Sequence, residues 1–338
     1  MTLTRPHVFV TRTLPGTEPL ARLRAAADVE VWPEVRPPAA DELLRGVTHA
    51  DGLLTMITDR IDGAVMDAAP ALRVVAQMAV GYDNIDVAAA TARSVAVTNT
   101  PDVLTETTAD LAFALLLAAA RRLPDGEAAV RGGQWGPWHP TWMLAHDVHD
   151  TTLGIVGGGR IGAAVARRAA GFGMRVLYHS RHPQPTFPGE RVEFAALLAQ
   201  SQFVSVHVPL TPETAGMFDT AAFAAMRPDA VFVNTARGGV VDQTALLEAL
   251  QSGTIAAAAL DVMSPEPLPP DDPLLAAPNL IVTPHLGSAT ERTRIAMASM
   301  AVDDLVAALR GRQPKHLVNP QMWVSPEASS TAQGRRQA

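Results

Sequence analysis

Short runs of β-branched and aromatic residues alternate with Ala- and Leu-rich stretches along most of the chain, and this alternation constrains the fold most. Alternating β and α segments indicate parallel sheets with helices on their faces. The predicted strands are 7–11, 53–58, 73–80 and 94–98, followed by 152–156, 174–178, 203–207, 230–234, 255–261 and 280–283. The six strands of the second series are enough for a full dinucleotide-type sheet.

Two long helices divide these series. The sequence predicts one helix over 105–122, stopped by Leu123-Pro124, and another over 289–309 that returns to the first sheet. The predicted division is a discontinuous substrate-binding domain of residues 1–100 and 286–318, a dinucleotide-binding Rossmann domain of residues 101–285, and a poorly ordered tail of residues 319–338.

Composition excludes several classes of protein. The 338 residues include 27 Lys and Arg against 34 Asp and Glu, a formal net charge of −7, and no Cys. A mildly acidic chain without Lys/Arg blocks offers no surface for nucleic acid or an anionic membrane, and the lack of thiols excludes disulfides and cysteine chemistry. The longest apolar run, 111–120, is far shorter than the roughly 20 residues of a spanning helix. We expect no metal and, without a signal peptide at the start, a cytoplasmic address.

The segment 131–150 is rich in tryptophan, glycine and proline. It contains Trp135, Trp138 and Trp142, three of the five tryptophans of the chain. This composition predicts an irregular loop with large apolar anchors, and such anchors usually contact another surface.

A glycine-rich turn follows the strand predicted at 152–156. The string Gly157-Gly-Gly159-Arg-Ile-Gly162 opens an Ala-rich helix. In such a turn Gly157 permits the tight bend, Gly159 lets the backbone approach a pyrophosphate, and Gly162 lets the helix pack closely on the strand. A bare glycine pattern is weak evidence, but the strand before it and the helix after it predict a dinucleotide-binding loop.

The end of the next strand indicates which nucleotide binds. NAD enzymes usually carry an acidic residue there for the ribose hydroxyls, whereas this chain has Ser180, eighteen residues after Gly162, followed by Arg181. Arg181 could meet a 2′-phosphate, and at about 5 Å one such pair contributes on the order of 3 kcal/mol. The sequence therefore favours NADP(H) over NAD(H), with a solvated surface role for Arg181 as the alternative.

Three polar side chains follow strands of the second series, at the edge where open α/β sheets bind ligands. They are Arg237, Glu266 and His285. A 2-oxo acid needs a cation for its carboxylate and a donor on its carbonyl, and Arg237 could provide both. His285 could supply the proton that reduction requires, while Glu266 would orient the imidazole and favour its charged form. The pattern predicts that the three side chains converge beside a bound nicotinamide.

Several motifs in order resemble the D-isomer-specific 2-hydroxyacid dehydrogenases, over about residues 50–315. They are VGYDNID (80–86), TPDVLTETTAD (100–110), the glycine loop, VPLTPET (208–214), NTARGG (234–239), DVMSPEP (261–267) and PHLGS (284–288). Within this family the chain most resembles the glyoxylate/hydroxypyruvate reductases, through RGGQWGPW (131–138), SPEPLP (264–269) and HLGSATERTR (285–294). The resemblance implies two α/β domains, Rossmann-like or flavodoxin-like, with parallel sheets and the active site in the cleft between them.

The resemblance also implies a substrate site. Val80 and Gly81 would bind the substrate carboxylate through backbone amides beside Arg237, with Ser288 and His285 near the substrate. The family implies a homodimer, built mainly by the cofactor domain, in which a tryptophan of the 131–150 loop reaches the neighbouring site. We favour Trp142, with Trp138 or a purely structural interface aromatic as alternatives.

The matching cofactor positions fall into four groups. They are Gly157, Gly159, Arg160 and Ile161 for the pyrophosphate; Ser180, Arg181, His182 and Pro183 for the adenosine end; Pro209 and Thr214 for the adenine side; and Thr105, Thr235, Ala236, Asp261, His285 and Gly287 for the nicotinamide region. Asp261 would face the nicotinamide amide. Gly158 departs from the family, since many members have a larger apolar residue there.

We therefore expect NADPH-dependent reduction of glyoxylate or hydroxypyruvate to the D-hydroxy acid. Reduction of 2-ketogluconate or another 2-oxo acid is the alternative within the family, and formate oxidation is disfavoured because Glu266 is not an amide. A dinucleotide-sensing, corepressor-like binding protein is the alternative of another class. No added basic or peptide-binding segment favours it.

Overall fold

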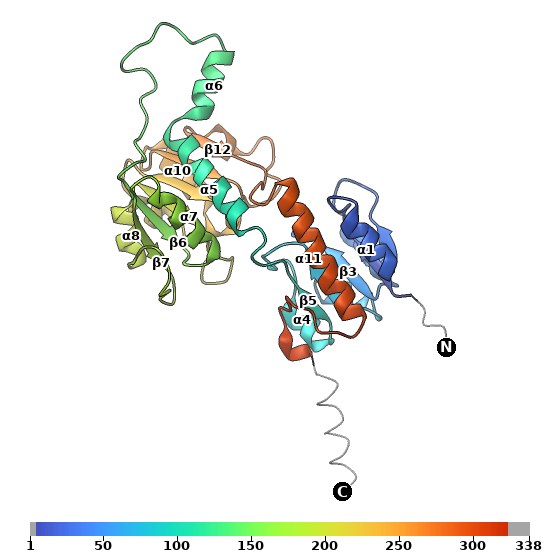
Figure 1. The fold of residues 1–338 in the computed structure, drawn as a ribbon. Coiled ribbons are helices and arrows are strands. Elements are labelled where there is room, and N and C mark those ends of the chain that lie inside the picture. Colours follow the sequence, from blue (N-terminus) through green and yellow to red (C-terminus); the bar gives the residue numbers. More distant parts are fainter. Residues whose placement is uncertain (1–4, 324–338) are drawn as a thin grey trace. The chain divides into compact units, whose positions relative to one another are not determined.

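The computed structural model describes residues 5–323, which form two compact units (Figure 1). One unit comprises residues 5–104 and 290–323, and the other comprises residues 105–289. Each unit is built on one sheet in which every strand pair is parallel. The predicted fold class, two α/β domains with parallel sheets, is confirmed.

The first unit has a five-stranded sheet in the order β2-β1-β3-β4-β5, a flavodoxin-like order. Its strands are β1 (His7–Val10), β2 (Asp28–Val31), β3 (Gly52–Thr55), β4 (Val74–Gln77) and β5 (Ala96–Thr98). Its helices are α1 (Glu18–Ala26), α2 (Ala40–Val47), α3 (Gly63–Asp67), α4 (Val87–Ala92), α11 (Glu291–Leu309) and the 3-10 turn η3 (Pro320–Met322). Helix α11 packs on α1 and on the strands β3, β4 and β5, so this unit is discontinuous in sequence.

The second unit has a seven-stranded sheet in the order β12-β11-β10-β9-β6-β7-β8. Its strands are β6 (Thr152–Val156), β7 (Arg175–His179), β8 (Glu190–Arg191), β9 (Phe203–Val206), β10 (Val231–Asn234), β11 (Ala257–Leu260) and β12 (Leu280–Val282). Its helices are α5 (Thr105–Ala120), α6 (Leu123–Arg131), α7 (Arg160–Ala170), α8 (Phe194–Gln200), α9 (Thr220–Ala224), α10 (Gln243–Gln251) and the 3-10 turns η1 (Gly238–Val240) and η2 (Pro273–Ala276). The order reverses between β6 and β9, the switch point at which such sheets bind dinucleotides.

The sheet of the second unit is buried on both faces. On β11, Ala257 and Ala259 belong to an apolar cluster with α5 and α7, whereas Ala258 and Leu260 belong to a cluster on the opposite face. Because successive side chains of a strand point to opposite faces, a strand covered on both sides is apolar at every position. This explains why the predicted strands read as continuous apolar runs. Helices α5 and α7 lie side by side on one face (Figure 1).

Two strands that the sequence pattern did not predict lie at sheet edges. Strand β2, with the sequence DVEV, closes one edge of the first sheet, and the two-residue β8 closes one edge of the second. An edge strand has a partner on one side only and can keep charged side chains in water. Neither segment therefore shows an apolar run, and the second sheet has seven strands where six were predicted.

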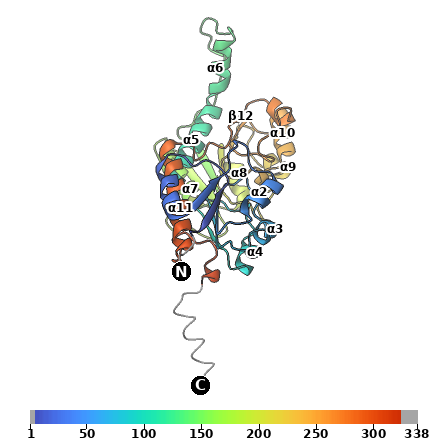
Figure 2. The same cartoon turned by 90° about the vertical axis from the view of Figure 1, so that its right-hand side faces the viewer.

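Helix α6 and the loop after it extend away from the sheet of their unit in both views (Figures 1 and 2). The sequence predicted a helix over 105–122 that stops at Leu123-Pro124. In the structure α5 ends at Ala120, and Leu123 and Pro124 instead begin α6. Arg122, with a left-handed φ of 52°, separates the two helices, and Pro124 fits the first turn of α6. The loop 132–150 contains no helix or strand. Its tryptophans are solvent-exposed, by 69% for Trp135, 85% for Trp138 and 43% for Trp142.

The tail predicted over 319–338 starts too early. Asn319 is fully buried, and its side-chain Oδ1 accepts from the Val97 amide at 2.8 Å while its Nδ2 donates to the Val95 carbonyl at 2.9 Å. Asn319 thus pairs with the open edge of β5, an interaction that a composition argument cannot detect. The part of the predicted tail from residue 324 onward lies outside the described residues.

Candidate active site

The glycine turn after β6 is as tight as its sequence requires. Gly157 has a φ of 116°, and a β-carbon on it would lie 2.5 Å from the His207 carbonyl oxygen. A β-carbon on Gly162 would lie 2.2 Å from the Gly157 oxygen, so α7 can approach the turn only without a side chain there. Around Gly159, in contrast, no described atom apart from those of Gly159 and its two chain neighbours lies within 4 Å of the β-carbon position. This space at the amino end of α7 fits a pyrophosphate held by backbone amides.

His207 lies beside this turn, directly after β9, and sequence reasoning missed it. Burial lowers the pKa of His207 to about 3, and its Nε2 lies 2.8 Å from the Ser205 hydroxyl. The imidazole is therefore neutral at physiological pH and adds no charge to the phosphate region. A lone histidine in an apolar strand carries no signal that would have marked it.

The end of β7 holds the residues predicted for the adenosine side. The Ser180 hydroxyl donates to the His182 carbonyl at 2.6 Å, which closes a short turn, and Arg181 and Pro183 are exposed on it. An arginine from β8, Arg191, donates to the Ser180 carbonyl at 3.0 Å. Sequence reasoning did not single out Arg191, because β8 was not predicted.

The adenine-side loop is closed by its own hydroxyl. Thr214 Oγ1 donates to the Pro209 carbonyl at 2.6 Å. A hydrogen bond from the Thr211 hydroxyl, and to a smaller extent the charge of Arg181, hold the pKa of Glu213 below its usual range. The charge of Arg181 therefore acts on this loop, although the two segments are separated in sequence.

Glu266 and His285 form a direct pair. His285 Nδ1 lies 2.8 Å from Glu266 Oε2, and the Met263 amide donates to the other carboxylate oxygen at 2.8 Å. Partial burial by itself raises the pKa of Glu266, but the hydrogen bond and charge of His285, the Met263 amide and the charge of Arg237 together lower it below its ordinary value. Glu266 is thus an anion that fixes the imidazole through Nδ1, which leaves Nε2 as the nitrogen for proton transfer.

The loop that carries His285 is held by a buried carboxylate. His285 has a left-handed φ of 55°, which is strained for a residue with a side chain. Asp261, 1% exposed, accepts from the Thr283 hydroxyl at 2.6 Å and from the amides of Leu286 at 2.7 Å and Gly287 at 2.8 Å. Its carbonyl also accepts from the His285 amide at 3.0 Å. Asp261 therefore organises the turn on both sides of His285.

Arg237 sits on a turn that is fixed in a similar way. The side chain of the fully buried Asn234 donates to the Arg237 carbonyl and accepts from the Ala236 amide, both at 2.9 Å. A β-carbon on Gly238 would lie 2.0 Å from backbone atoms of Met263, so this turn touches the segment that leads to Glu266. The structure therefore brings the predicted residues Arg237, Glu266 and His285 together in the second unit.

The predicted nicotinamide region contains a polar atom without a partner. Thr235 is only 9% exposed, and among the described residues its Oγ1 has no hydrogen-bond partner. Ser288 is likewise 9% exposed, and the Gly287 carbonyl accepts a hydrogen bond from Thr108 of α5. Thr105 begins α5. A buried hydroxyl without a partner carries an energetic penalty, so Thr235 fits a bound ligand with a polar group there.

In the first unit, the predicted substrate amides follow β4. The Val80 carbonyl accepts from Asn99 at 2.7 Å, and the Gly81 carbonyl accepts from Gln77 at 3.2 Å, so both peptide planes are fixed. Within residues 5–323 neither the Val80 nor the Gly81 amide donates a hydrogen bond to the backbone. Two oriented N–H groups of this kind suit an anionic ligand such as a carboxylate.

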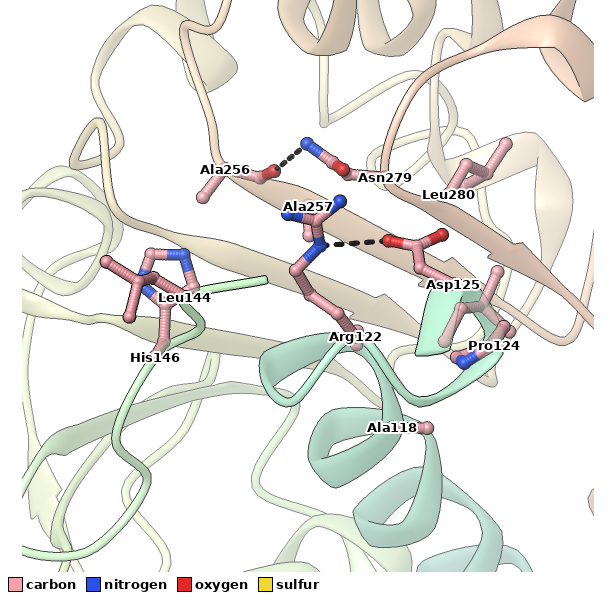
Figure 3. Close-up of a pocket in the computed structure, with 12 residues that line it drawn as sticks. Ala118, Arg122, Pro124, Asp125, Leu144, His146, Ala256, Ala257, Asn279 and Leu280 are labelled. Atoms are coloured by element: carbon pink, nitrogen blue, oxygen red, sulfur yellow. Dashed lines mark hydrogen bonds and ion pairs between the residues drawn. The ribbon is translucent and has the colours of Figure 1, made fainter. Parts of the chain in front are cut away.

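An additional pocket of about 120 Å³ lies at the amino-terminal ends of β11 and β12 in the second sheet (Figure 3). Its lining includes the ion pair of Arg122 with Asp125 at 2.9 Å. The glycine turn and His285 instead follow carboxyl ends of strands, so this pocket is separate from the candidate site. In the described part of the chain, no group of three or more Asp, Glu and His is placed to hold a metal, and no helix is long and apolar enough to cross a membrane.

A doubly wound sheet with a glycine turn at its switch point, and a carboxylate–imidazole pair at the same edge, defines a dinucleotide-binding oxidoreductase of the dehydrogenase class. Sequence comparison then gives the family. The profile described as D-isomer specific 2-hydroxyacid dehydrogenase, NAD binding domain, matches residues 113–287. The chain belongs to this family, as its motifs predicted.

The similar proteins cover nearly the whole chain. The glyoxylate reductase of Korarchaeum cryptofilum is 50% identical over 323 residues, 94% of this chain and 97% of that protein. A solved structure from Thermus thermophilus is 50% identical with a TM-score of 0.88, covering 92% of this chain and 99% of the other. The NADPH-dependent glyoxylate/hydroxypyruvate reductase of Sinorhizobium meliloti, solved with NADP and malonate, is 35% identical with a TM-score of 0.81, covering 93% and 97%. The chain is thus an oxidoreductase that uses a nicotinamide dinucleotide.

Proposed function

We propose that this protein reduces glyoxylate or hydroxypyruvate to the D-2-hydroxy acid with NADPH. Support comes from the glyoxylate reductases to which the chain is similar and from the side chains at the carboxyl edge of the second sheet. In this proposal the second unit binds the dinucleotide and the first unit binds the substrate. The observation that carries the proposal is the 2.8 Å contact between His285 and Glu266 on a loop fixed by Asp261.

Each residue of the site has a distinct chemical task in this reaction. Arg237 binds the substrate carboxylate and polarises the carbonyl through its planar guanidinium, and the Val80 and Gly81 amides add donors to the same carboxylate. When bound, the nicotinamide supplies the hydride. His285 Nε2 donates a proton to the carbonyl oxygen, and the Glu266 carboxylate orients the imidazole through Nδ1.

The cofactor would be held by the turns described above. Gly157, Gly159 and the first residues of α7, Arg160 and Ile161, would bind the pyrophosphate, and Thr235 would meet a polar group of the nicotinamide half. Ser180 and Arg181 stand where an acidic residue would bind the ribose of NAD. We infer that the 2′-phosphate of NADPH binds there.

Replacement of both residues tests the nucleotide preference. Ser180→Asp with Arg181→Ala introduces an anion and removes a cation, so the ratio of kcat/KM for NADPH over NADH should fall at least about tenfold. If this ratio equals that of the wild type, Ser180 and Arg181 do not determine the nucleotide preference.

We also propose a homodimer formed through α6 and the loop 132–150. This segment extends from its unit and carries exposed tryptophans, which are typical of interface anchors. In the dimer, Trp142 or, failing that, Trp138 would reach the neighbouring substrate site. Light scattering of the purified chain checks the dimer, and Trp142→Ala should raise KM for the 2-oxo acid; a monomer with full activity would contradict both statements.

The substrate is tested with a panel of 2-oxo acids and both reduced nicotinamides. We expect the highest kcat/KM with glyoxylate or hydroxypyruvate and NADPH. If NADPH is oxidised with 2-ketogluconate and not with glyoxylate, the substrate is a larger 2-oxo acid than we propose. Tight NADPH binding without turnover of any 2-oxo acid would instead favour a dinucleotide-sensing binding protein.

A further inference from the structure

Among the described residues, Arg191 has no acidic partner, and it lies at the adenosine end of the second unit. Its neighbour on β8, Glu190, forms an ion pair with Arg175 of β7 at 2.7 Å. Arg191 points to the other face, because successive side chains of a strand alternate. No carboxylate in residues 5–323 forms an ion pair with it, and its hydrogen bonds go only to the Ser180 carbonyl. Of the two arginines on this strand pair, Arg175 is thus paired with a carboxylate, and Arg191 keeps N–H groups that can bind an anion.

The position of Arg191 is set by the register of the sheet. Arg191 pairs with Tyr178, so it lies at the carboxyl end of β7, two residues before Ser180. Its Nη2 and Nε lie 3.0 Å and 3.4 Å from the Ser180 oxygen. In doubly wound sheets the residue at this strand end is the one that recognises the ribose 2′ position. The guanidinium therefore lies beside the position where a 2′-phosphate would bind.

The turn that contains Ser180 rests directly on the glycine loop. A β-carbon on Gly158 would lie 3.0 Å from Gln184 Cγ and 3.2 Å from the Ser180 hydroxyl. The Gln184 amide is also bonded to the Tyr178 hydroxyl at 3.1 Å. Gly158 therefore leaves room for the turn after β7 to pack against the phosphate-binding loop, which keeps Ser180 and Arg191 close to it.

We propose that Arg191 is a second cation, with Arg181, for the 2′-phosphate of NADPH, and that it is a determinant of nucleotide preference in this chain. The inference rests on the proposed NADPH preference. A phosphate monoester carries nearly two negative charges at neutral pH, and a guanidinium has five N–H donors in a planar fork. Arg191 can therefore keep its bond to the Ser180 carbonyl and donate its remaining N–H groups to the phosphate.

The test measures binding of NADPH and NADH to the full chain by fluorescence titration, independently of turnover, in the wild type and in Arg191→Ala. Because the contact is partly exposed, we expect NADPH to bind roughly five- to tenfold more weakly, with NADH unchanged. The same loss should appear with 2′,5′-ADP and not with 5′-AMP, since these probes differ only at the 2′ position. Arg191→Lys, which keeps the charge, should restore part of the affinity.

Arg175→Ala is the matched control, since this arginine lies on the neighbouring strand but already pairs with Glu190. It should leave the NADPH-to-NADH ratio unchanged. Suppose that the wild type prefers NADPH, that Arg181→Ala abolishes this preference and that Arg191→Ala leaves it unchanged. This result would overturn the inference on Arg191 and leave the proposed function standing. Equal weakening of both nucleotides by Arg191→Ala would also overturn it, as a structural effect. A wild type without preference would overturn the proposed nucleotide as well.

Discussion

The two sheets use the same structural device at their carboxyl edges, but only one of them attaches a reactive group to it. After β3, the buried Asp59 accepts from the hydroxyls of Thr11 at 2.5 Å and Thr55 at 2.9 Å and from the Met56 amide at 2.8 Å. After β11, the buried Asp261 also accepts hydrogen bonds, but from the loop that holds His285.

This comparison separates the role of the scaffold from the role of the site. A buried carboxylate with several donors can fix a loop wherever parallel strands end. In the first unit the loop held by Asp59 carries none of the proposed reactive side chains, and in the second unit the loop held by Asp261 carries an imidazole in a strained conformation beside a second carboxylate. Function therefore follows from the side chains on the loop and not from the sheet below it.

The largest expected effect is that of His285→Ala. Removing the proton donor should lower reductive kcat about 10²- to 10⁴-fold, while the NADPH dissociation constant stays near the wild-type value because the glycine turn is untouched. Steady-state kinetics with NADPH titration checks this. Retained turnover would assign the proton to water or to another residue.

Asp261→Asn should have the next largest effect on activity. Both carboxylate oxygens of Asp261 accept hydrogen bonds from backbone amides, whereas the asparagine side chain has one oxygen and one NH₂ group, which cannot accept. One of these bonds is therefore lost in the variant. The turn at His285, which holds about 1–3 kcal/mol of backbone strain, would then relax. We expect kcat to fall about 10- to 100-fold, with the NADPH dissociation constant less affected. If NADPH binding fell as much as kcat, Asp261 would act mainly on the nicotinamide amide.

Asp59→Asn is the matched substitution in the first unit. It should lower the free energy of unfolding by about 1–3 kcal/mol, because buried donors lose their charged acceptor. Its kcat should remain near the wild-type value, since no reactive side chain depends on Asp59. Chemical denaturation and kinetics on the same preparation distinguish the two aspartates, and an equal loss of kcat in both variants would end the comparison.

The pH dependence sharpens the role of the Glu266–His285 pair. Reductive kcat/KM should fall about tenfold per pH unit once the imidazolium loses its proton, and this limb reports the pair as a coupled unit. On the acid side the lowered pKa of Glu266 keeps it charged through the ordinary range of a glutamate, so activity should persist there. Glu266→Gln should lower kcat, because it removes the carboxylate that fixes the imidazole through Nδ1. A flat profile would exclude the pair as the proton source.

The smallest expected effect is that of Gly158→Leu. A side chain there would displace Gln184 and Ser180 from the glycine loop, and NADPH affinity should fall about two- to fivefold more than NADH affinity, as for a weakened exposed charge contact. Isothermal titration with both nucleotides measures it. An equal change for both would show that Gly158 affects only the shared pyrophosphate contacts.

Much of the fold could be predicted because buried parallel strands are apolar at every position. The missed strands β2 and β8 lie at edges, where water accepts charged side chains, and their absence from the prediction concealed Arg191. Asn319 was assigned to a tail because its only signal is a hydrogen-bonded contact with β5, more than two hundred residues earlier in the chain.

The sequence by itself determined the order of strands and helices, the glycine turn and the residue types available for acid, anion and cation roles, since each depends on local pattern and chemistry. Only the tertiary structure decided which of these groups meet. The 2.8 Å contact of Glu266 with His285, the loop held by Asp261 and the approach of Arg191 to Ser180 join segments that the chain separates. Parallel strands bring their carboxyl ends to one edge whatever their distance in sequence, and packing then fixes which side chains face each other there.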